Sequence, residues 1–502
     1  MPKSINPLDV VYDVAIISPL DKAEKLSKQI GTNLFIKRED TQEVHSFKIR
    51  GAYNKIVSLS DEEKKNGVLA ASAGNHAQGV AYSAKKLKLK ATIVMPETTP
   101  SIKVDAVRGY GANVVLFGDS YSDSYAKALE IMKKTGASFV HPFDDLEVIA
   151  GQGTIANEIL DQLPGVTHIF VPVGGGGLLA GILQVVKKIN PKVKVIGVEP
   201  DDSNAMGKSI KANERLLLEH VGIFADGVAV KQVGEHTFRI VKEHVDEIIK
   251  VNNDKICAAI KSIFEETRNI CEPAGALAVA GAVKYFSKKK FLEPDSKKHL
   301  NVVCINSGAN LSFERLQFIA ERTLIGEKVE SLFAIEIPET PGALKTLYKK
   351  VIHGFSISEF SYRLTDRENA NIFIGLITST PKNRELIKTR LEKYGFSYSD
   401  LSGDEYSKEH VRFMIGGKSE ITKDEKIYSF DFPERPGALS EFLDAIGNKF
   451  NISLFHYRGQ GGDTGQVLMG FEAKNRSELE AILDTTEYDY KEVSSKAVKT
   501  FL

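Results

Sequence analysis

The sequence predicts an α/β protein with a mostly parallel sheet, followed by two small α+β units. From about residue 15 to 325, short β-branched segments alternate with amphipathic helical segments, which indicates βαβ units. The strand segments are continuously apolar, so we expect both faces of the sheet to be covered. After residue 330 an internal repeat replaces this alternation.

The expected elements of the first region are short strands separated by longer helices. The strands are Leu34–Lys37, Ala91–Met95, Val114–Phe117, His168–Val173, Val193–Val198 and Val302–Ile305. The helices are Gly79–Leu87, Ser101–Tyr110, Tyr125–Lys133, Ile149–Leu160 and Leu178–Lys188.

The repeat consists of two homologous units. The segment TPGAL at 340–344 recurs as RPGAL at 435–439, and ISEFSYR at 357–363 recurs as ISLFHYR at 452–458; Pro341 and Pro436 are 95 residues apart. Each unit follows the order strand, Pro-Gly turn, helix, strand, strand, which is typical of a ferredoxin-like βαββαβ fold. We expect domains at 1–325, 331–403 and 425–496. The expected elements are strands Phe333–Ile337, Ile372–Ile377, Ile427–Phe432 and Val467–Phe471, and helices Ala343–Val351 and Leu439–Ile446.

The composition argues against several classes of function. Lys+Arg and Asp+Glu both number 66, so no net charge favours nucleic acid or an anionic membrane. The three cysteines, which are Cys257, Cys271 and Cys304, lack the spacing of a disulfide framework or a zinc site. We find no apolar run of about 18 residues and no targeting pattern, and therefore expect a cytoplasmic protein.

Two motifs could hold a reactive amine and a ligand carboxylate. In Ser46–Ala52 (SFKIRGA), a lysine that forms a Schiff base needs a lowered pKa, and Arg50 and Phe47 could supply positive charge and burial. The alternative is a surface lysine. In Ser72–Gly79 (SAGNHAQG), small residues at a strand-to-helix turn expose N–H groups that suit a carboxylate. The alternative is a simple helix cap.

Two further motifs follow predicted strands. Gly174–Leu178 (GGGGL) opens a helix, which favours a phosphate site at the helix N-terminus. A dinucleotide site is the alternative, since Gly175 to Ala180 fits GxGxxA and Glu199 ends the next strand. Asn306–Asn310 (NSGAN) lies where ligands bind such sheets, and a Ser307 hydroxyl could face a ring nitrogen. A turn with a helix cap is equally compatible.

Taken in this order, the motifs SFKIRGA, SAGNHAQG, GGGGL and SGAN resemble those of pyridoxal-phosphate enzymes of fold type II (the tryptophan-synthase-β-like fold), and most closely the biosynthetic threonine dehydratases, or threonine ammonia-lyases. The resemblance covers nearly the whole chain, with ACT-like units at the C-terminus. It implies that Lys48 carries pyridoxal 5'-phosphate, that Asn75 contacts the ring hydroxyl and that Ser307 faces the ring nitrogen. The full set of implied cofactor contacts is Phe47, Lys48, Asn75, Gly174, Gly175, Gly176, Gly177, Leu178 and Ser307.

The resemblance also implies the reaction. Freed Lys48 would act as general base on threonine, and water and ammonia would leave to give 2-oxobutanoate, the first committed step of isoleucine biosynthesis. The substrate carboxylate would lie against Ser72, Ala73, Gly74, Asn75 and His76. Related serine racemases have a second serine before the glycine, where this chain has Ala73, so racemisation is disfavoured. The residues after Glu199-Pro200 do not match the metal-holding relatives, so we expect no metal.

For the C-terminal units the resemblance implies feedback inhibition by isoleucine, opposed by valine, and a homotetramer. We expect the effector sites at Tyr362, Arg363, Tyr457 and Arg458. The segment 459–462 (GQGG) differs from Leu364–Asp366 of the first unit, so the two pockets should not be equivalent. Two alternatives stay open: a serine dehydratase or related β-eliminating lyase, and a non-catalytic regulator that senses an amino acid.

Overall fold

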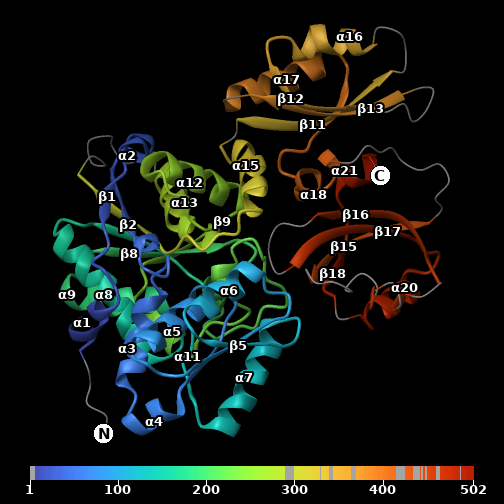
Figure 1. The fold of residues 1–502 in the computed structure, drawn as a ribbon. Helices are drawn as coiled ribbons and strands as arrows, with labels where there is room; N and C mark the ends of the chain where they lie inside the picture. Colours follow the sequence, from blue (N-terminus) through green and yellow to red (C-terminus); the bar gives the residue numbers. More distant parts are fainter. Residues whose placement is uncertain are drawn as a thin grey trace. The chain divides into compact units, whose positions relative to one another are not determined.

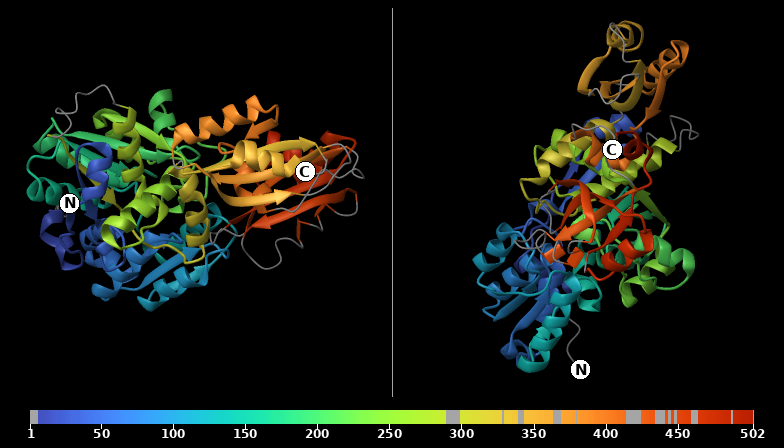
Figure 2. Two further views of the ribbon diagram at one scale, coloured as in Figure 1. Left: turned by 90° about the horizontal axis from the view of Figure 1, so that it is seen from above. Right: turned by 90° about the vertical axis from the view of Figure 1, so that its right-hand side faces the viewer.

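The computed structural model divides into two compact units, Met1–Arg315 and Leu316–Leu502, here called the N-terminal and C-terminal units (Figures 1 and 2). The residues that it describes are 6–288, 299–327, 329–338, 343–362, 369–378, 380–413, 424–433, 441–442, 445–446, 449–458, 464–486 and 488–501.

The larger sheet of the N-terminal unit has the strand order β1-β2-β10-β7-β8-β9. Its strands are β1 (Leu20–Lys22), β2 (Asn33–Arg38), β7 (His168–Pro172), β8 (Lys194–Pro200), β9 (Glu247–Val251) and β10 (Asn301–Asn306). The edge strand β1 is antiparallel to β2, and the other pairs are parallel. Helix α13 (Pro273–Lys288) lies on one face and α9 (Gly177–Ile189) on the other, which explains the apolar strands (Figure 1).

A second, four-stranded parallel sheet in this unit has the order β5-β4-β3-β6. The strands are β3 (Val68–Ala71), β4 (Ala91–Met95), β5 (Asn113–Leu116) and β6 (Ser138–Phe139). Its helices are α5 (Asn75–Lys86), α6 (Ser101–Gly109) and α7 (Tyr121–Thr135), while α3 (Lys48–Ser58) and α8 (Leu146–Gln162) pack beside it.

The C-terminal unit contains two four-stranded antiparallel sheets with equivalent orders, β12-β13-β11-β14 and β16-β17-β15-β18. The strands of the first are β11 (Glu330–Pro338), β12 (Ser356–Tyr362), β13 (Asn369–Ile377) and β14 (Ser397–Asp400). Those of the second are β15 (Glu425–Pro433), β16 (Asn451–Arg458), β17 (Thr464–Glu472) and β18 (Tyr490–Glu492). Both orders are ferredoxin-like, so the expected fold class is confirmed.

The structure differs from the expected elements at several places, among them the following three. Helix α5 begins at Asn75, four residues before the expected start, because Asn75 and His76 of the SAGNH segment already belong to the helix, with Gly74 as its N-cap. Strand β9 (EIIKV) was not expected, because its charged ends hide its short apolar centre. In the first repeat the helix ends as α16 (Ala343–Leu347), followed by the π-helical turn Tyr348–Ile352. The Pro-Gly turns of both repeats, at 341–342 and 436–437, lie outside the described residues.

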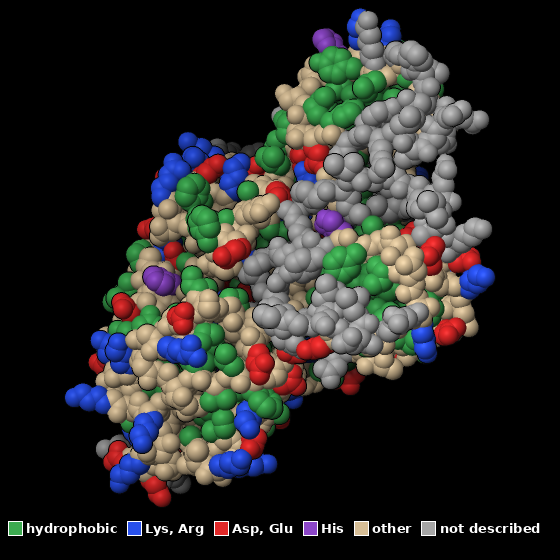
Figure 3. Space-filling view, turned by 45° about the vertical axis from the view of Figure 1, so that its right-hand side comes forward, with side chains coloured by type: hydrophobic (Ala, Val, Ile, Leu, Met, Phe, Trp, Pro, Cys, Tyr) green, Lys and Arg blue, Asp and Glu red, His purple; other side chains and the backbone are tan. Residues whose placement is uncertain are grey.

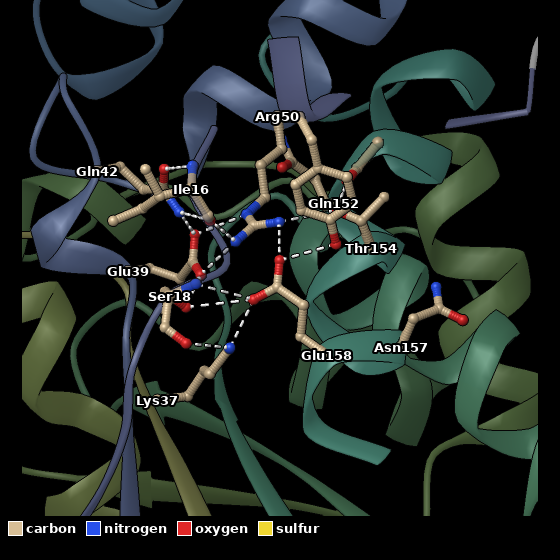
Figure 4. A network of polar contacts seen from close by, with 12 residues as sticks. Ile16, Ser18, Lys37, Glu39, Gln42, Arg50, Gln152, Thr154, Asn157 and Glu158 are labelled. Carbon is tan, nitrogen blue, oxygen red and sulfur yellow. Dashed lines mark hydrogen bonds and ion pairs between the residues drawn. The ribbon is translucent and has the colours of Figure 1, made fainter. Parts of the chain in front are cut away.

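A buried ion network joins helix α3 to strand β2 and helix α8 (Figure 4). The Arg50 guanidinium lies 2.8 Å from a carboxylate oxygen of Glu39 and 2.6 Å from one of Glu158. Lys37 Nζ lies 2.5 Å from the other Glu158 oxygen. All four side chains are almost completely buried, and their charges balance. Two cations and two carboxylates therefore satisfy one another inside the core.

The surface shows no comparable concentration of charge on the face drawn in Figure 3. On the N-terminal unit, basic and acidic side chains are interspersed on this face, which agrees with the zero net charge (Figure 3). None of the described helices combines the length and apolarity that a membrane crossing requires. The three cysteines are free and buried.

We predict that Arg50→Leu destabilises the N-terminal unit by about 3–5 kcal/mol, because it leaves the Glu39 carboxylate buried without its cation and Glu158 with Lys37 alone. The chain has no tryptophan, so urea unfolding is followed by far-ultraviolet circular dichroism. As a control, Lys22→Met removes an exposed pair with Glu24 and should leave the midpoint unchanged. Equal midpoints for Arg50→Leu and the wild type would contradict the prediction.

Candidate active site

Lys48 begins helix α3 and its amine is buried. Nζ donates to the carbonyl oxygen of Pro142 at 2.7 Å and lies 5.3 Å from the centroid of the Phe47 ring. Burial lowers the pKa of Lys48 to about 8, and the negative charge of Glu272 opposes this shift. A buried amine with this pKa is neutral for part of the time near neutral pH, as a nucleophile or a base requires.

The expectation that Arg50 lowers the pKa of Lys48 is wrong. The guanidinium is engaged by Glu39 and Glu158, and burial is the cause of the lowered pKa. In a helix, residues two positions apart point about 200° apart, so Lys48 and Arg50 leave α3 on nearly opposite sides.

The segment after strand β6 carries the partner of Lys48 and touches the glycine loop. Pro142 accepts the Lys48 hydrogen bond, and the next residue, Phe143, packs against Gly175 and Gly177. A Cβ atom at Gly175 would lie 2.3 Å from the Phe143 ring, and one at Gly177 would lie 3.0 Å from Phe143 Cα. Sequence reasoning missed this segment, whose signal is the HPFDD run at 141–145 between a strand and a helix.

The glycine loop approaches its neighbours too closely for side chains. A Cβ atom at Gly174 would lie 2.8 Å from Val228 Cα, and one at Gly176 would lie 2.6 Å from Met206 Cε. Gly176 has φ +96° and precedes helix α9 without any side-chain cap. The first N–H groups of α9 are therefore available to an anion.

Helix α5 begins in the same way. Gly74 precedes Asn75 and forms no side-chain cap, although its own N–H donates to Ser72 Oγ at 3.3 Å. Ser72, Ala73, Gly74 and Asn75 are half-buried, as a loop that faces a ligand requires. The His76 side chain instead lies under the loop, where its Nε2 contacts the Val140 carbonyl oxygen at 2.7 Å.

Two histidines near Lys48, the buried His76 and the half-buried His141, are held neutral. Burial lowers the pKa of His76 to about 3 and that of His141 to about 4, and the Lys48 charge acts in the same direction. His76 Nε2 faces a carbonyl and so carries the hydrogen. His141 Nδ1 accepts the N–H groups of Phe143 and Asp144, so its hydrogen is on Nε2. Neither histidine therefore carries a positive charge beside the Lys48 amine.

Sequence reasoning also missed Glu272, whose signal is an acid and a proline at the start of helix α13. Its carboxylate accepts a hydrogen bond from Asn75 Nδ2 at 2.6 Å. Burial and the charge of Asp226 raise the pKa of Glu272 to about 7. Asp226 lies 2.8 Å from Lys103 Nζ and 3.4 Å from Arg315, and these cations hold its pKa well below the usual range despite burial.

The SGAN motif lies directly beside the lysine motif. The Phe47 N–H donates to the Ser307 carbonyl at 3.2 Å, and Ser46 forms an isolated β-bridge with Gly308. Close by, Ser46 Oγ, His76 Nδ1 and both amide atoms of Asn306 are buried without a hydrogen-bond partner among the described residues. The structure therefore brings all four motifs together and leaves unsatisfied polar atoms around them.

Glu199, the acid considered for a dinucleotide, has a different role. Its two carboxylate oxygens accept the N–H groups of Met206 and Gly207, each at 2.8 Å, at the start of helix α10 (Ala205–Ala212). Among the described residues, no group of three or more His, Cys, Asp or Glu side chains is arranged to hold a metal ion.

The two repeats of the C-terminal unit share one local device. Ser358 and Ser453 each lie at a β-bulge and donate to the first residue of the strand two places along in the sheet, which is Glu330 of β11 and Glu425 of β15 respectively. The next position differs: Glu359 binds Arg412 at 2.6 Å, whereas the second repeat has Leu454. Arg363 and the segment 459–462 lie outside the described residues, as do the side chains of Tyr362, Tyr457 and Arg458.

Comparison with known proteins agrees with this geometry. Residues 12–308 match the model of the family described as "Pyridoxal-phosphate dependent enzyme". Residues 321–411 and 417–502 match the family described as "C-terminal regulatory domain of Threonine dehydratase". A biosynthetic L-threonine dehydratase of Burkholderia multivorans is 48% identical over 98% of this chain and 97% of its own length. The chain belongs to the pyridoxal-phosphate-dependent threonine dehydratases.

Two further relatives extend the family across kingdoms. The chloroplastic biosynthetic threonine dehydratase of Arabidopsis thaliana is 47% identical over 96% of this chain and 80% of its own length. The processed form of threonine deaminase isoform 2 from Solanum lycopersicum has a solved structure, which is 50% identical with a TM-score of 0.61. That match covers 63% of this chain and 91% of the tomato chain.

The residues present fit pyridoxal phosphate, the cofactor of this family. The uncapped α9 N-terminus with its glycine loop suits the phosphate, because any Cβ there would collide with Phe143, Val228 or Met206. The buried Lys48 amine suits the aldehyde. The unpartnered polar atoms of Ser46, His76 and Asn306 are what a site that receives a polar group would show.

We predict that Gly175→Ala weakens pyridoxal phosphate binding at least about fivefold, because overpacking against Phe143 costs about 1–3 kcal/mol. Affinity is measured by titrating the cofactor-free chain and following cofactor absorbance. The matched control is Gly109→Ala in helix α6, where an added Cβ meets nothing within 4 Å. Unchanged affinity of Gly175→Ala would refute the close packing.

Proposed function

We propose that this protein converts L-threonine to 2-oxobutanoate and ammonia, as the first committed step of isoleucine biosynthesis, under feedback inhibition by isoleucine that valine opposes. The observation that carries the proposal is the buried amine of Lys48, with its pKa lowered to about 8, beside an uncapped glycine loop. The family membership supports the same reaction class.

The proposed cofactor contacts are those expected from the sequence. Pyridoxal phosphate, when bound, supplies an aldehyde that bonds amines and a ring that spreads negative charge from Cα. Lys48 would hold the aldehyde, Asn75 the ring hydroxyl, and Ser307 would face the ring nitrogen. The remaining contacts are Phe47, Gly174, Gly175, Gly176, Gly177 and Leu178.

The chain's own residues account for the proton transfer and for substrate orientation. Once its amine is free, Lys48 takes the Cα proton at Nζ, and the Pro142 carbonyl keeps that amine in place. His76 and His141 are neutral, so neither offers a positive charge that could draw the substrate's α-carboxylate away from its proposed site. The first turn of α5, with the loop Ser72–Gly74, would receive that carboxylate.

The same proposal assigns the domains and the assembly. The catalytic domain spans 1–325, and two ACT-like regulatory domains span 331–403 and 425–496. The match of the C-terminal residues to a threonine dehydratase regulatory domain supports an effector site there. A homotetramer and a cytoplasmic location remain predictions; relatives in Arabidopsis and in Schizosaccharomyces pombe are described as chloroplastic and mitochondrial.

We expect purified protein to release 2-oxobutanoate from L-threonine, and Lys48→Ala to release none above background because the base and cofactor anchor are lost. Keto acid is measured with threonine and with serine as substrates. Lys55→Ala, which alters the other lysine of helix α3, controls for loss of charge there. Pyruvate from serine with no product from threonine would favour the serine dehydratase alternative, and no product from either would favour a regulator.

We expect Tyr362→Ala and Tyr457→Ala to raise the isoleucine concentration needed for half-inhibition, by different factors because the two repeats differ at Glu359 and Leu454. The measurement is the threonine dehydratase rate against isoleucine concentration, with and without valine. Unchanged inhibition curves in both variants would place the effector site elsewhere.

A further inference from the structure

The amide of Asn75 is fixed at both ends. Its Nδ2 donates to Glu272 Oε1 at 2.6 Å, and its Oδ1 accepts from Asn310 Nδ2 at 2.6 Å. Asn310 Nδ2 is itself held by the Val44 carbonyl at 2.9 Å. Since an amide has two hydrogens on nitrogen and two lone pairs on oxygen, Asn75 keeps one of each for a ligand. An inverted amide would lose both contacts, so only one orientation is stable.

The Glu272 carboxylate that contacts Asn75 packs closely against two glycines, Gly308 and Gly227. A Cβ atom at Gly308 would lie 2.7 Å from Glu272 Oε1, and one at Gly227 would lie 3.5 Å from it. The Glu272 N–H also donates to the Gly308 carbonyl at 3.1 Å. The carboxylate is therefore packed directly against the Ser307–Gly308 turn, between two motifs that the sequence assigned to the cofactor.

Charge links the same carboxylate to Lys48. The groups that act on Glu272 are Asp226 on the turn 226–228, Lys103 on α6 and Arg315, and these two cations offset the Asp226 charge. Glu272 in turn opposes the lowering of the pKa of Lys48 that burial causes. Because burial raises the pKa of Glu272 to about 7, the two groups titrate in adjacent ranges.

We propose that Glu272 is a positioning residue of the dehydratase reaction: its carboxylate fixes the Asn75 amide for the cofactor. Its negative charge, which also acts on the Lys48 amine, provides a second readout. The inference deepens the proposed function and rests on it for the role of Asn75. Two separable effects follow. Glu272→Gln keeps a hydrogen-bond acceptor for Asn75 and removes the charge, whereas Glu272→Ala removes both.

The charge effect is measured on the full chain freed of cofactor, from the pH dependence of Lys48 acetylation read by peptide mass spectrometry. Only the neutral amine reacts, so the midpoint gives the pKa of Lys48, expected at about 8 in the wild type. We expect Glu272→Gln to lower that pKa by about 1. The matched control is Glu199→Gln, since Glu199 is also buried with its pKa raised to about 7 but bonds only helix α10 backbone in the described contacts. It should leave the pKa of Lys48 unchanged.

The orientation effect is measured as pyridoxal phosphate affinity, by absorbance titration, together with kcat and KM for threonine. We expect affinity within about twofold of wild type for Glu272→Gln and roughly tenfold weaker for Glu272→Ala, the effect of losing one charge-assisted hydrogen bond. Thermal unfolding accompanies each variant, since a purely structural role would lower the midpoint without moving the pKa of Lys48.

An unchanged pKa of Lys48 in Glu272→Gln, or wild-type cofactor affinity in Glu272→Ala, would overturn the inference. If wild-type protein forms no keto acid from threonine while both shifts appear, the proposed function fails and the positioning role of Glu272 stands.

Discussion

Helix α3 is held in place by the buried guanidinium of Arg50, and the orientation of Lys48 depends on that contact. Glu39 engages the guanidinium from the 3-10 turn that follows strand β2, and Glu158 engages it from helix α8. Lys37 balances the second carboxylate. Because the planar guanidinium accepts only a narrow range of geometries, α3 cannot rotate about its axis without breaking several bonds at once. Lys48, on the nearly opposite side of the same helix, therefore projects in a fixed direction.

The surroundings of Lys48 combine two opposing influences on its charge. Burial favours the neutral amine, and the fixed tautomers of His76 and His141 keep further cations out. The negative charge of Glu272 favours the protonated amine. An amine that must both bond a carbonyl group and exchange a proton needs both forms to be accessible near neutral pH. The balance between burial and one carboxylate provides that, and no residue in the described part of the chain forms an ion pair with Lys48.

The C-terminal unit shows how a repeated fold can differ in its details. Both repeats keep the bulge serine and its glutamate partner, which are Ser358 with Glu330 and Ser453 with Glu425. Only the first repeat places an acid, Glu359, beside that bulge. A duplicated scaffold therefore presents two chemically different environments.

The sequence by itself determined the elements with strong local signals. Apolar strands such as Ala91–Met95, the glycine run 174–177 and the 95-residue repeat predicted the α/β unit and the two ferredoxin-like units, because period and turn chemistry are local properties. Only the tertiary structure decided the partners of Lys48 and Asn75. Pro142, Glu272 and Asn310 lie 94, 197 and 235 residues from those partners. Contacts over such distances leave no periodic signal, so burial and charge near Lys48 could be assigned only from the folded chain.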